Sequence, residues 1–325
     1  MKTARDSSLI VLAIFLSVIA TLILTPFGCG ESMEKGILKV TFLDIRQGDS
    51  QVIQTPDGRV IVIDGGQSAT HYSPFDAGKE VVIPYLESQG VKKIDVVVAT
   101  HPDYDHTGGL IAVLNSHFPI GMVLDCGIVH TTATYKRYLK AIADKKVPII
   151  IPDAGDILDW GPSIQAQVLA PLGPPECRGH LNLNNNSIVI RLEYGEVSFL
   201  FTGDCEHEEE DVILSSGARI KSTILKAGHH GSKTASGSLF YYMCDPEVVT
   251  ISAGKRNKFN HPHWEPMKLF RETGAEIYRT DFMGNITVFT DGKTYEVVSG
   301  EWNSLGADLR NLNNINWLDP ICSCF

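Results

Sequence analysis

The sequence lacks the local motifs that mark several large enzyme classes. It contains no G-x-S-x-G turn, no Walker phosphate loop and no C-x-x-C pair. The sequence therefore does not support a hydrolase with a serine nucleophile, a P-loop nucleotide hydrolase or a zinc knuckle. The sequence also has no low-complexity tract, and 20% of its 325 residues are charged. This composition is typical of a globular protein, and the length suits one α/β domain.

Excess positive charge is also absent. The formal net charge is -10, so the field of the whole molecule would repel a polyanion. The net charge therefore gives no indication of nucleic-acid binding, and any contact with nucleic acid is expected to be confined to a local basic surface. Seven cysteines are present, and the sequence does not indicate a disulfide pairing. Cys126 and Cys244 are expected to be small buried apolar side chains.

No run of 18 or more apolar residues follows residue 30, so this chain cannot form a transport channel alone. Before that point, Lys2 and Arg5 precede an apolar stretch from Leu9 to Leu24. Residues 1–30 are therefore predicted to be a targeting segment: a lipoprotein signal, an uncleaved membrane anchor or a secretion signal. All three alternatives place the domain outside the cytoplasm, either membrane-anchored or secreted.

The end of this segment bears on the choice between them. Gly28 and Cys29 resemble the end of a bacterial-type lipoprotein signal, in which the cysteine becomes lipidated. Pro26 and Phe27 depart from the residues that such signals prefer, so the three alternatives stay open.

Residues 36–300 are predicted to form one domain of strands and helices in mixed order. Period-two and apolar runs predict strands over residues 37–45, 50–55 and 59–64, and a helix over 78–90 leads into a buried strand over 94–100. The second half continues this mixture, which favours a sheet-on-sheet core with outer helices over a doubly wound sheet. The Asn-rich tail, residues 301–325, shows no period and is expected to be peripheral.

The strongest chemical signal is the segment HPDYDH, which is followed by TGG. Its four ligand-type side chains are His101, Asp103, Asp105 and His106. They stand at the end of a buried strand, where a turn can direct them into one cavity. Carboxylates this close would repel one another unless a cation neutralised them, so the segment predicts a metal centre.

HPDYDH with TGG resembles the signature of the metallo-β-lactamase superfamily, in the variant with Asp at the third position. That variant is similar to the hydrolase domain of ComEC-type DNA-uptake proteins and their stand-alone relatives. The segments FLDIRQGDS, VIDGG, NNNSIVIRL, LFTGD, LKAGHHGSK and YRTDFMGNI match further family segments in order, with Arg46 where Gly is usual. The resemblance covers roughly residues 37 to 290 and implies an αβ/βα four-layer sandwich, two mixed sheets flanked by helices.

The resemblance also implies two divalent metal ions, zinc or manganese. The implied ligands are imidazoles and carboxylates from three segments: His101, Asp103, Asp105, His106, Asp204 and His261. His101 and Asp103 would face one ion, Asp105 and His106 the other, and Asp204 would bridge them. His263 is the alternative to His261 in the shell of the second ion.

One position departs from this pattern. Where the superfamily supplies a further histidine, the chain has NNNS, so Asn184 or Asn186 would substitute weakly, or His180 would do so from upstream. An oxygen-rich first site would favour manganese or another hard cation over zinc.

The segment AGHHGSKT predicts the catalytic groups. His229, His230 and Lys233 would form a phosphate cradle in which one histidine protonates the leaving oxygen, and Asp105 would orient the attacking hydroxide. A structural loop of hydrogen-bonded imidazoles is the alternative. The basic run GKRNK beside His261 is expected either to be solvated or to contact backbone phosphates.

Together these features favour an extracytoplasmic phosphodiesterase, acting on DNA with a hydroxide activated by two metal ions. One alternative is hydrolysis of a lactone, thioester or β-lactam, because a fold does not determine the substrate. Another is a non-catalytic accessory protein of DNA uptake. Nucleic acid, the membrane through the N-terminal segment and a DNA-uptake channel are the expected partners, and the sequence does not indicate the oligomeric state.

Overall fold

The computed structural model describes residues 36–71, 73–175 and 182–300. The predicted targeting segment with Cys29, the tail over residues 301–325, and His180 all lie outside the described residues. The elements given below belong to the unit that begins at Ile37. Within the described ranges, no helix is both long enough and apolar enough to cross a membrane.

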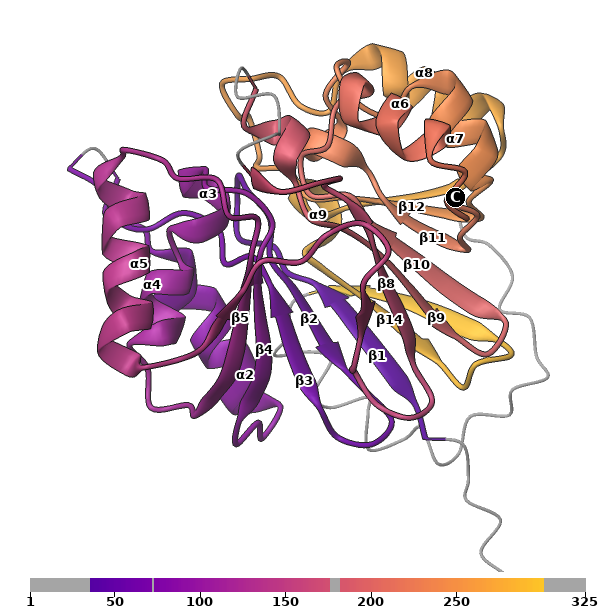
Figure 1. Cartoon of the computed structure of the whole chain (residues 1–325). Coiled ribbons are helices and arrows are strands. Elements are labelled where there is room, and N and C mark those ends of the chain that lie inside the picture. The colour runs from indigo at the N-terminus through magenta and orange to yellow at the C-terminus, as the bar shows by residue number, and fades with distance from the viewer. Residues whose placement is uncertain (1–35, 72, 176–181, 301–325) are drawn as a thin grey trace, which may run out of the picture. The chain divides into compact units, whose positions relative to one another are not determined.

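The first sheet has eight strands in the order β15-β14-β1-β2-β3-β4-β5-β6 (Figure 1). Neighbouring strands from β3 to β6 are parallel, and the other pairs are antiparallel. The strand bounds are β1 Leu38–Phe42, β2 Gln51–Gln54, β3 Val60–Ile63, β4 Ile94–Ala99, β5 Ile120–Asp125, β6 Ile149–Ile150, β14 Asn285–Thr290 and β15 Tyr295–Gly300.

The second sheet has seven strands in the order β13-β12-β11-β10-β9-β8-β7. Here β10 to β13 pair in parallel and β7 to β10 pair antiparallel. The strand bounds are β7 Ile157–Leu158, β8 Gln165–Ala170, β9 Val189–Tyr194, β10 Val197–Phe201, β11 Ile224–Lys226, β12 Val248–Ile251 and β13 Glu276–Arg279.

Helices cover the outer face of each sheet. On the first sheet lie α2, α4 and α5, and on the second lie α6, α7 and α8 (Figure 1). This arrangement confirms the predicted four-layer αβ/βα sandwich. The helical segments are η1 Gly78–Val82, α2 Ile83–Ser88, α3 Tyr104–Thr107, α4 Leu110–Leu114, α5 Ala133–Lys145, η3 Asn184–Asn186, α6 His207–Ser215, η4 Gly228–Gly231, α7 Ser238–Cys244, α8 Trp264–Glu272 and α9 Thr280–Met283.

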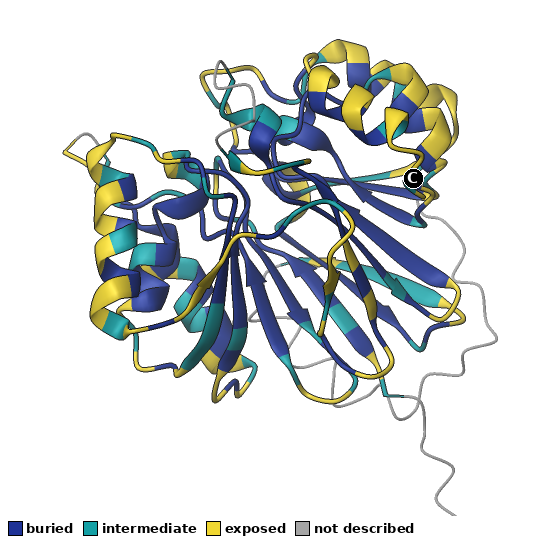
Figure 2. Ribbon diagram, in the orientation of Figure 1, coloured by how far each residue is buried: buried dark blue, intermediate teal, exposed yellow. Residues whose placement is uncertain are grey.

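The strands are apolar on both faces because both faces are covered. Side chains alternate along a strand, so Ile53 and Ile61 face the other sheet while Val52 and Val62 pack under the helices. Figure 2 shows the strands largely buried and the helices exposed on their outer sides. This two-sided burial explains why the sequence shows continuous apolar runs where half-buried strands would alternate with polar residues.

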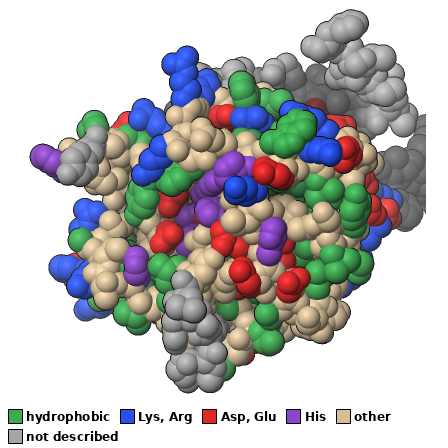
Figure 3. All heavy atoms as spheres, turned by 90° about the horizontal axis from the view of Figure 1, so that it is seen from above, with side chains coloured by type: hydrophobic (Ala, Val, Ile, Leu, Met, Phe, Trp, Pro, Cys, Tyr) green, Lys and Arg blue, Asp and Glu red, His purple; other side chains and the backbone are tan. Residues whose placement is uncertain are grey.

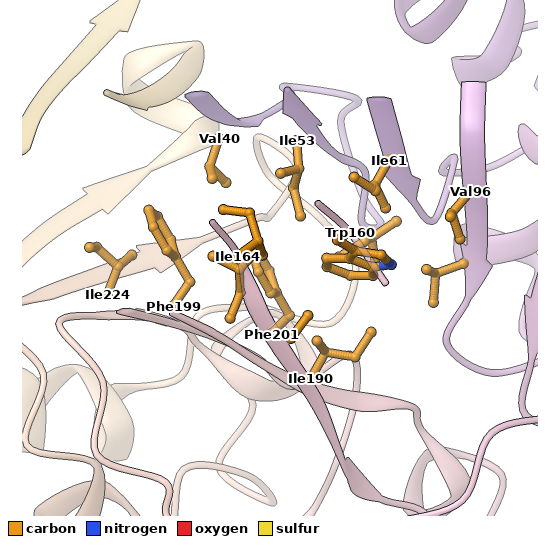
Figure 4. Close-up of a cluster of buried hydrophobic side chains, with 14 of the residues drawn as sticks. Val40, Ile53, Ile61, Val96, Trp160, Ile164, Ile190, Phe199, Phe201 and Ile224 are labelled. Atoms are coloured by element: carbon orange, nitrogen blue, oxygen red, sulfur yellow. The ribbon is translucent and has the colours of Figure 1, made fainter. Parts of the chain in front are cut away.

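Aromatic side chains fill the space between the sheets. Val40 and Ile53 of the first sheet lie opposite Phe199 and Phe201 of the second, with Trp160 beside them (Figure 4). The rings of Phe199 and Phe201 are stacked, with centroids 6.0 Å apart. Because these side chains touch both sheets, they determine how the loops of one sheet meet the loops of the other.

Some elements differ from the sequence-based prediction. Strands β8 and β13 and helix α7 were not predicted. The apolar run over residues 147–151 forms a strand only at Ile149–Ile150, at the sheet edge. In β8, exposed glutamines alternate with Ala166 and Val168, which gives a weak apolar signal. The predicted burial of Cys126 and Cys244 is confirmed.

Phe199→Ala should lower the free energy of unfolding by about 3–5 kcal/mol, because it leaves a cavity between the sheets. Phe282→Ala is the matched control. Its ring is 72% exposed and meets the Arg279 guanidinium at 4.4 Å, so its loss should cost less than about 1 kcal/mol. Urea denaturation measures both values, and equal losses would contradict the packing described here.

Candidate metal centre

The site is built from loops that follow strands of both sheets. Asp64 follows β3, His101 follows β4, Asp204 follows β10, and His229 and His230 follow β11. Parallel strands end at the same edge of a sheet, so these loops converge at one end of the sandwich. Figure 3 looks down on this end, and histidine side chains gather near its centre with carboxylates around them.

Asp204 is the buried carboxylate at the centre of the cluster. Four imidazole nitrogens face its Oδ2: His106 Nε2 at 3.3 Å, His230 Nε2 at 3.4 Å, His229 Nε2 at 3.7 Å and His101 Nε2 at 4.0 Å. Burial by itself would raise the pKa of Asp204, but the nearby His230 and His106 hold it well below its usual value. The carboxylate is therefore charged across the neutral pH range.

The opposite nitrogen of each ring, Nδ1, is held by a neighbouring polar group. The pairs are His101 with Thr100 Oγ1 at 3.1 Å, His106 with Asp64 Oδ2 at 2.8 Å, His229 with Glu206 Oε1 at 2.8 Å and His230 with the Ser252 carbonyl at 3.1 Å. Metal-binding histidines are usually anchored in this way, which determines the ring orientation. Each Nε2 is thereby directed toward Asp204.

Several of these atoms are buried without a hydrogen-bond partner. Among the described residues they include Nε2 of His101, His106 and His230, and Oδ1 of Asp204. An unpartnered buried polar atom costs free energy, and a bound cation removes that cost. The cluster fits a divalent metal because it contains groups of three imidazole and carboxylate ligands, and the ligand atoms of each group lie within 4.8 Å of one another.

The HPDYDH segment supplies ligands on two sides of Asp204. Asp103 Oδ2 lies 3.7 Å from His101 Nε2, whereas Asp105 Oδ2 lies 3.5 Å from His230 Nε2. Burial opposes the charge of Asp105, but His230 and His106 lower its pKa to about 2. Among the described residues, the groups of three that could hold a cation include His101, His106 and Asp204, and Asp105, His106 and His230.

The HHG segment forms a tight turn that aims two adjacent rings at one point. His229 and His230 have φ angles of 45° and 55°, a left-handed backbone that is costly for residues other than glycine. The His230 ring is buried, and its Nε2 lies among the ligand atoms. The His229 side chain is 24% exposed, so it is the one of the four imidazoles that solvent or a substrate can reach.

Two further predicted residues, His261 and Lys233, lie beside the HHG turn. The His261 ring is 5.2 Å from that of His229, and burial together with nearby His230 lowers its pKa to about 4. Lys233 is exposed, and its backbone nitrogen donates to His263 Nδ1 at 3.0 Å.

The NNNS segment, where a further histidine was expected, contacts the groups that orient His229. Asn184 Nδ2 lies 3.4 Å from both Glu206 Oε1 and His229 Nδ1. Asn186 is buried, and its Nδ2 donates to the Asn182 carbonyl at 2.9 Å.

Sequence reasoning missed a buried ion pair beside the cluster. Lys226 pairs with Asp49, donates to the Gly203 carbonyl at 2.8 Å and lies 3.8 Å from Asp204 Oδ1. Burial opposes the charge of Asp49, but Lys226 and His230 keep its pKa below the usual value. A single lysine in the apolar strand β11 was the available signal.

The carboxylates that hold two of the imidazoles were also missed. Asp64 accepts hydrogen bonds from Thr100 N at 2.9 Å and Thr100 Oγ1 at 2.7 Å. Glu206 accepts from Thr234 Oγ1 at 2.5 Å, and although burial opposes its charge, His229 and Thr234 lower its pKa to about 2. Each carboxylate follows a strand, in VIDGG and LFTGDCE, and this position was the local signal.

The chain is similar in sequence to proteins of one superfamily. The sequence model of the metallo-beta-lactamase superfamily matches residues 43–255. ComE operon protein 3 of Bacillus subtilis (strain 168) is 35% identical over 259 residues, which cover 76% of this chain and 32% of that protein. Competence protein ComA of Neisseria gonorrhoeae is 27% identical over 278 residues, covering 82% and 36%.

A third relative, Recombination protein 2 of Haemophilus influenzae (strain ATCC 51907 / DSM 11121 / KW20 / Rd), is 25% identical over 258 residues, covering 79% of this chain and 29% of that protein. The chain therefore spans about a third of the length of the curated relatives it matches.

Asp204→Asn should abolish metal binding and leave the fold intact. The amide keeps the shape of the carboxylate but offers one neutral oxygen, so the attraction for cations falls without opening a cavity. Metal content and a melting curve recorded with chelator measure the two effects. Asp144→Asn, at a surface position, is the control and should retain metal. Near-normal metal content in Asp204→Asn would show that this carboxylate is not a ligand.

Proposed function

The chain belongs to the metallo-beta-lactamase superfamily, and we propose that it is a two-metal phosphodiesterase that hydrolyses nucleic acid. Membership of the superfamily supports a metal-dependent hydrolase. The observation that carries the proposal is the central carboxylate of Asp204, faced by four anchored imidazoles. The names of two relatives, a competence protein and a recombination protein, favour nucleic acid as the substrate.

His101 and Asp103 would hold one cation, Asp105, His106 and His230 the other, and Asp204 would bridge them. Zinc and manganese both suit these ligands, which are mixed in nitrogen and oxygen. When bound, such ions supply an activated water and neutralise the charge of the phosphoryl group.

The residues of the chain position and protonate the substrate. The His229 side chain is partly exposed, and the Glu206 carboxylate holds its Nδ1, so the ring can present a proton to the leaving oxygen. The exposed Lys233 follows the same turn and supplies an ammonium group for a phosphate oxygen. Asp105, with a pKa of about 2, is ionised at neutral pH and cannot serve as the acid.

We further propose that the enzyme acts outside the cytoplasm, tethered to the membrane through residues 1–30. Lys2 and Arg5 before the apolar stretch Leu9 to Leu24 support this location. A substrate there would be extracellular or incoming DNA, and a DNA-uptake channel is the partner that fits such a role.

A substrate panel tests the function. The purified chain is incubated with plasmid DNA, a single-stranded oligonucleotide, bis-p-nitrophenyl phosphate, a lactone and a β-lactam, each with zinc, manganese or chelator. We expect metal-dependent cleavage of the phosphodiesters by wild type. The Asp204→Asn variant is the negative control and should cleave none of them. Turnover of the lactone or β-lactam alone would favour the other hydrolase class. DNA binding without any hydrolysis would favour an accessory protein.

His229→Ala should retain bound metal and lose about 10²- to 10⁴-fold in phosphodiesterase rate, because the leaving oxygen loses its proton donor. Metal content and the rate on bis-p-nitrophenyl phosphate are measured on the same preparation. His130→Ala, at a histidine outside the cluster, serves as the control and should be fully active. If His229→Ala loses its metal together with its activity, the imidazole is a ligand and not the proton donor.

A further inference from the structure

We propose that two loops beside the metal centre form a binding surface for single-stranded polynucleotide. The loops are residues 44–48, after β1, and residues 254–261, after β12, and together they are called the rim loops. This inference rests on the proposed function, because it identifies the form of nucleic acid that the site accepts and the residues that hold it.

The rim loops contact each other and the site. Gln47 Oε1 accepts a hydrogen bond from Gly254 N at 3.1 Å. A Cβ added at Gly254 would lie 2.8 Å from Gln47 N, so the missing side chain permits this close approach. Next to the first loop, Asp49 N donates to the carbonyl of Asp105 at 3.2 Å. The two loops are therefore one continuous surface attached to the HPDYDH segment.

The rim loops carry four exposed cations: Arg46, Lys255, Arg256 and Lys258. Within the described part of the chain, none of the four forms an ion pair with a carboxylate, whereas Arg59, Arg191 and Arg279 each do. The whole chain has a net charge of -10, whereas the rim loops carry these four cations and one carboxylate, Asp44, which lies near Lys255 and Arg46. Basic side chains that lack carboxylate partners are available to phosphate groups, which dominate the affinity for nucleic acid.

Arg46 is held in a defined position at this surface. Its φ angle is 68°, a left-handed backbone that is unfavourable for a residue with a side chain. The guanidinium lies over the ring of Phe75 at 3.8 Å from the centroid. The positive charge is thus placed beside the site. The Arg46 backbone nitrogen donates to Asp44 Oδ1 at 3.2 Å, and among the described residues the guanidinium itself forms no ion pair.

An exposed aromatic ring stands among these cations. Phe259 is 41% exposed, lies nearly parallel to the His261 ring at 5.6 Å, and has Lys258 Nζ 4.9 Å from its centroid. Exposed rings interleaved with basic side chains are how proteins hold single strands, since bases stack on the rings while phosphates meet the cations. In a duplex the base faces are already stacked on one another. The ring therefore favours a single strand over a duplex.

Binding is measured apart from hydrolysis, on the full chain with chelator present. The probes are a fluorescent single-stranded oligonucleotide and its duplex, and the readout is anisotropy over a range of salt concentrations. Wild type should prefer the single strand. Arg46→Ala and Lys258→Ala should each weaken binding and reduce the slope of log K against log salt by about 1. Phe259→Ala should weaken single-strand binding by about 5- to 150-fold and leave the salt slope unchanged.

Matched controls lie away from the rim loops. Lys92→Ala removes an exposed cation before β4, at the opposite end of that strand from His101, and Tyr242→Ala removes an exposed ring on α7. Both should bind as wild type does. If the rim-loop variants bind the single strand as tightly as the controls, the proposed surface is wrong. A wild-type protein that prefers the duplex would also overturn it.

Hydrolysis of bis-p-nitrophenyl phosphate by wild type, with metal, separates this inference from the proposed function. If the phosphodiester is hydrolysed while the rim-loop variants bind the oligonucleotide normally, only the surface is wrong. If no phosphodiester is hydrolysed but the rim-loop variants lose binding selectively, the proposed function fails and the surface stands.

Discussion

The buried charge of Asp204 is the constraint on which the arrangement of the site depends. A carboxylate with so little access to water is tolerated only when opposite charges or hydrogen bonds surround it. Lys226 lies beside one oxygen of Asp204, and imidazole nitrogens face the other. Because Lys226 also pairs with Asp49, one ammonium group compensates two carboxylates, which explains a lysine at the end of the otherwise apolar β11.

The sandwich is what brings these groups to one place. The first sheet contributes the HPDYDH segment and Asp64, and the second contributes Asp204, Lys226 and the HHG turn. Among the described residues, the ligand groups that include Asp204 or His230 draw on loops of both sheets or on the second sheet together with Asp49 or Asp105 of the first. The distances between ligand atoms therefore depend on the packing between the sheets, where Phe199 and Phe201 meet side chains of the opposite sheet. Stability of the core and geometry of the site are linked through this contact.

The distribution of charge separates two tasks. Of the carboxylates that suit metal binding, Asp204 is buried among imidazoles and Asp103 and Asp105 are partly buried, whereas the four cations of the rim loops are exposed. A net charge of -10 would oppose the approach of a polyanion at long range. Within a Debye length of about 8 Å in physiological salt, local charges dominate. A basic surface next to the site can therefore attract phosphates although the protein as a whole is acidic.

The sequence by itself determined the layers and the central motif, because strand periodicity and the local spacing in HPDYDH are properties of short segments. The same holds for the burial of Cys126 and Cys244. Only the tertiary structure decided that Asp64 holds His106, that Glu206 holds His229 and that Lys226 pairs with Asp49. Those partners are far apart in the chain, and their contact follows from strand order and from the packing of the two sheets, which no local pattern encodes.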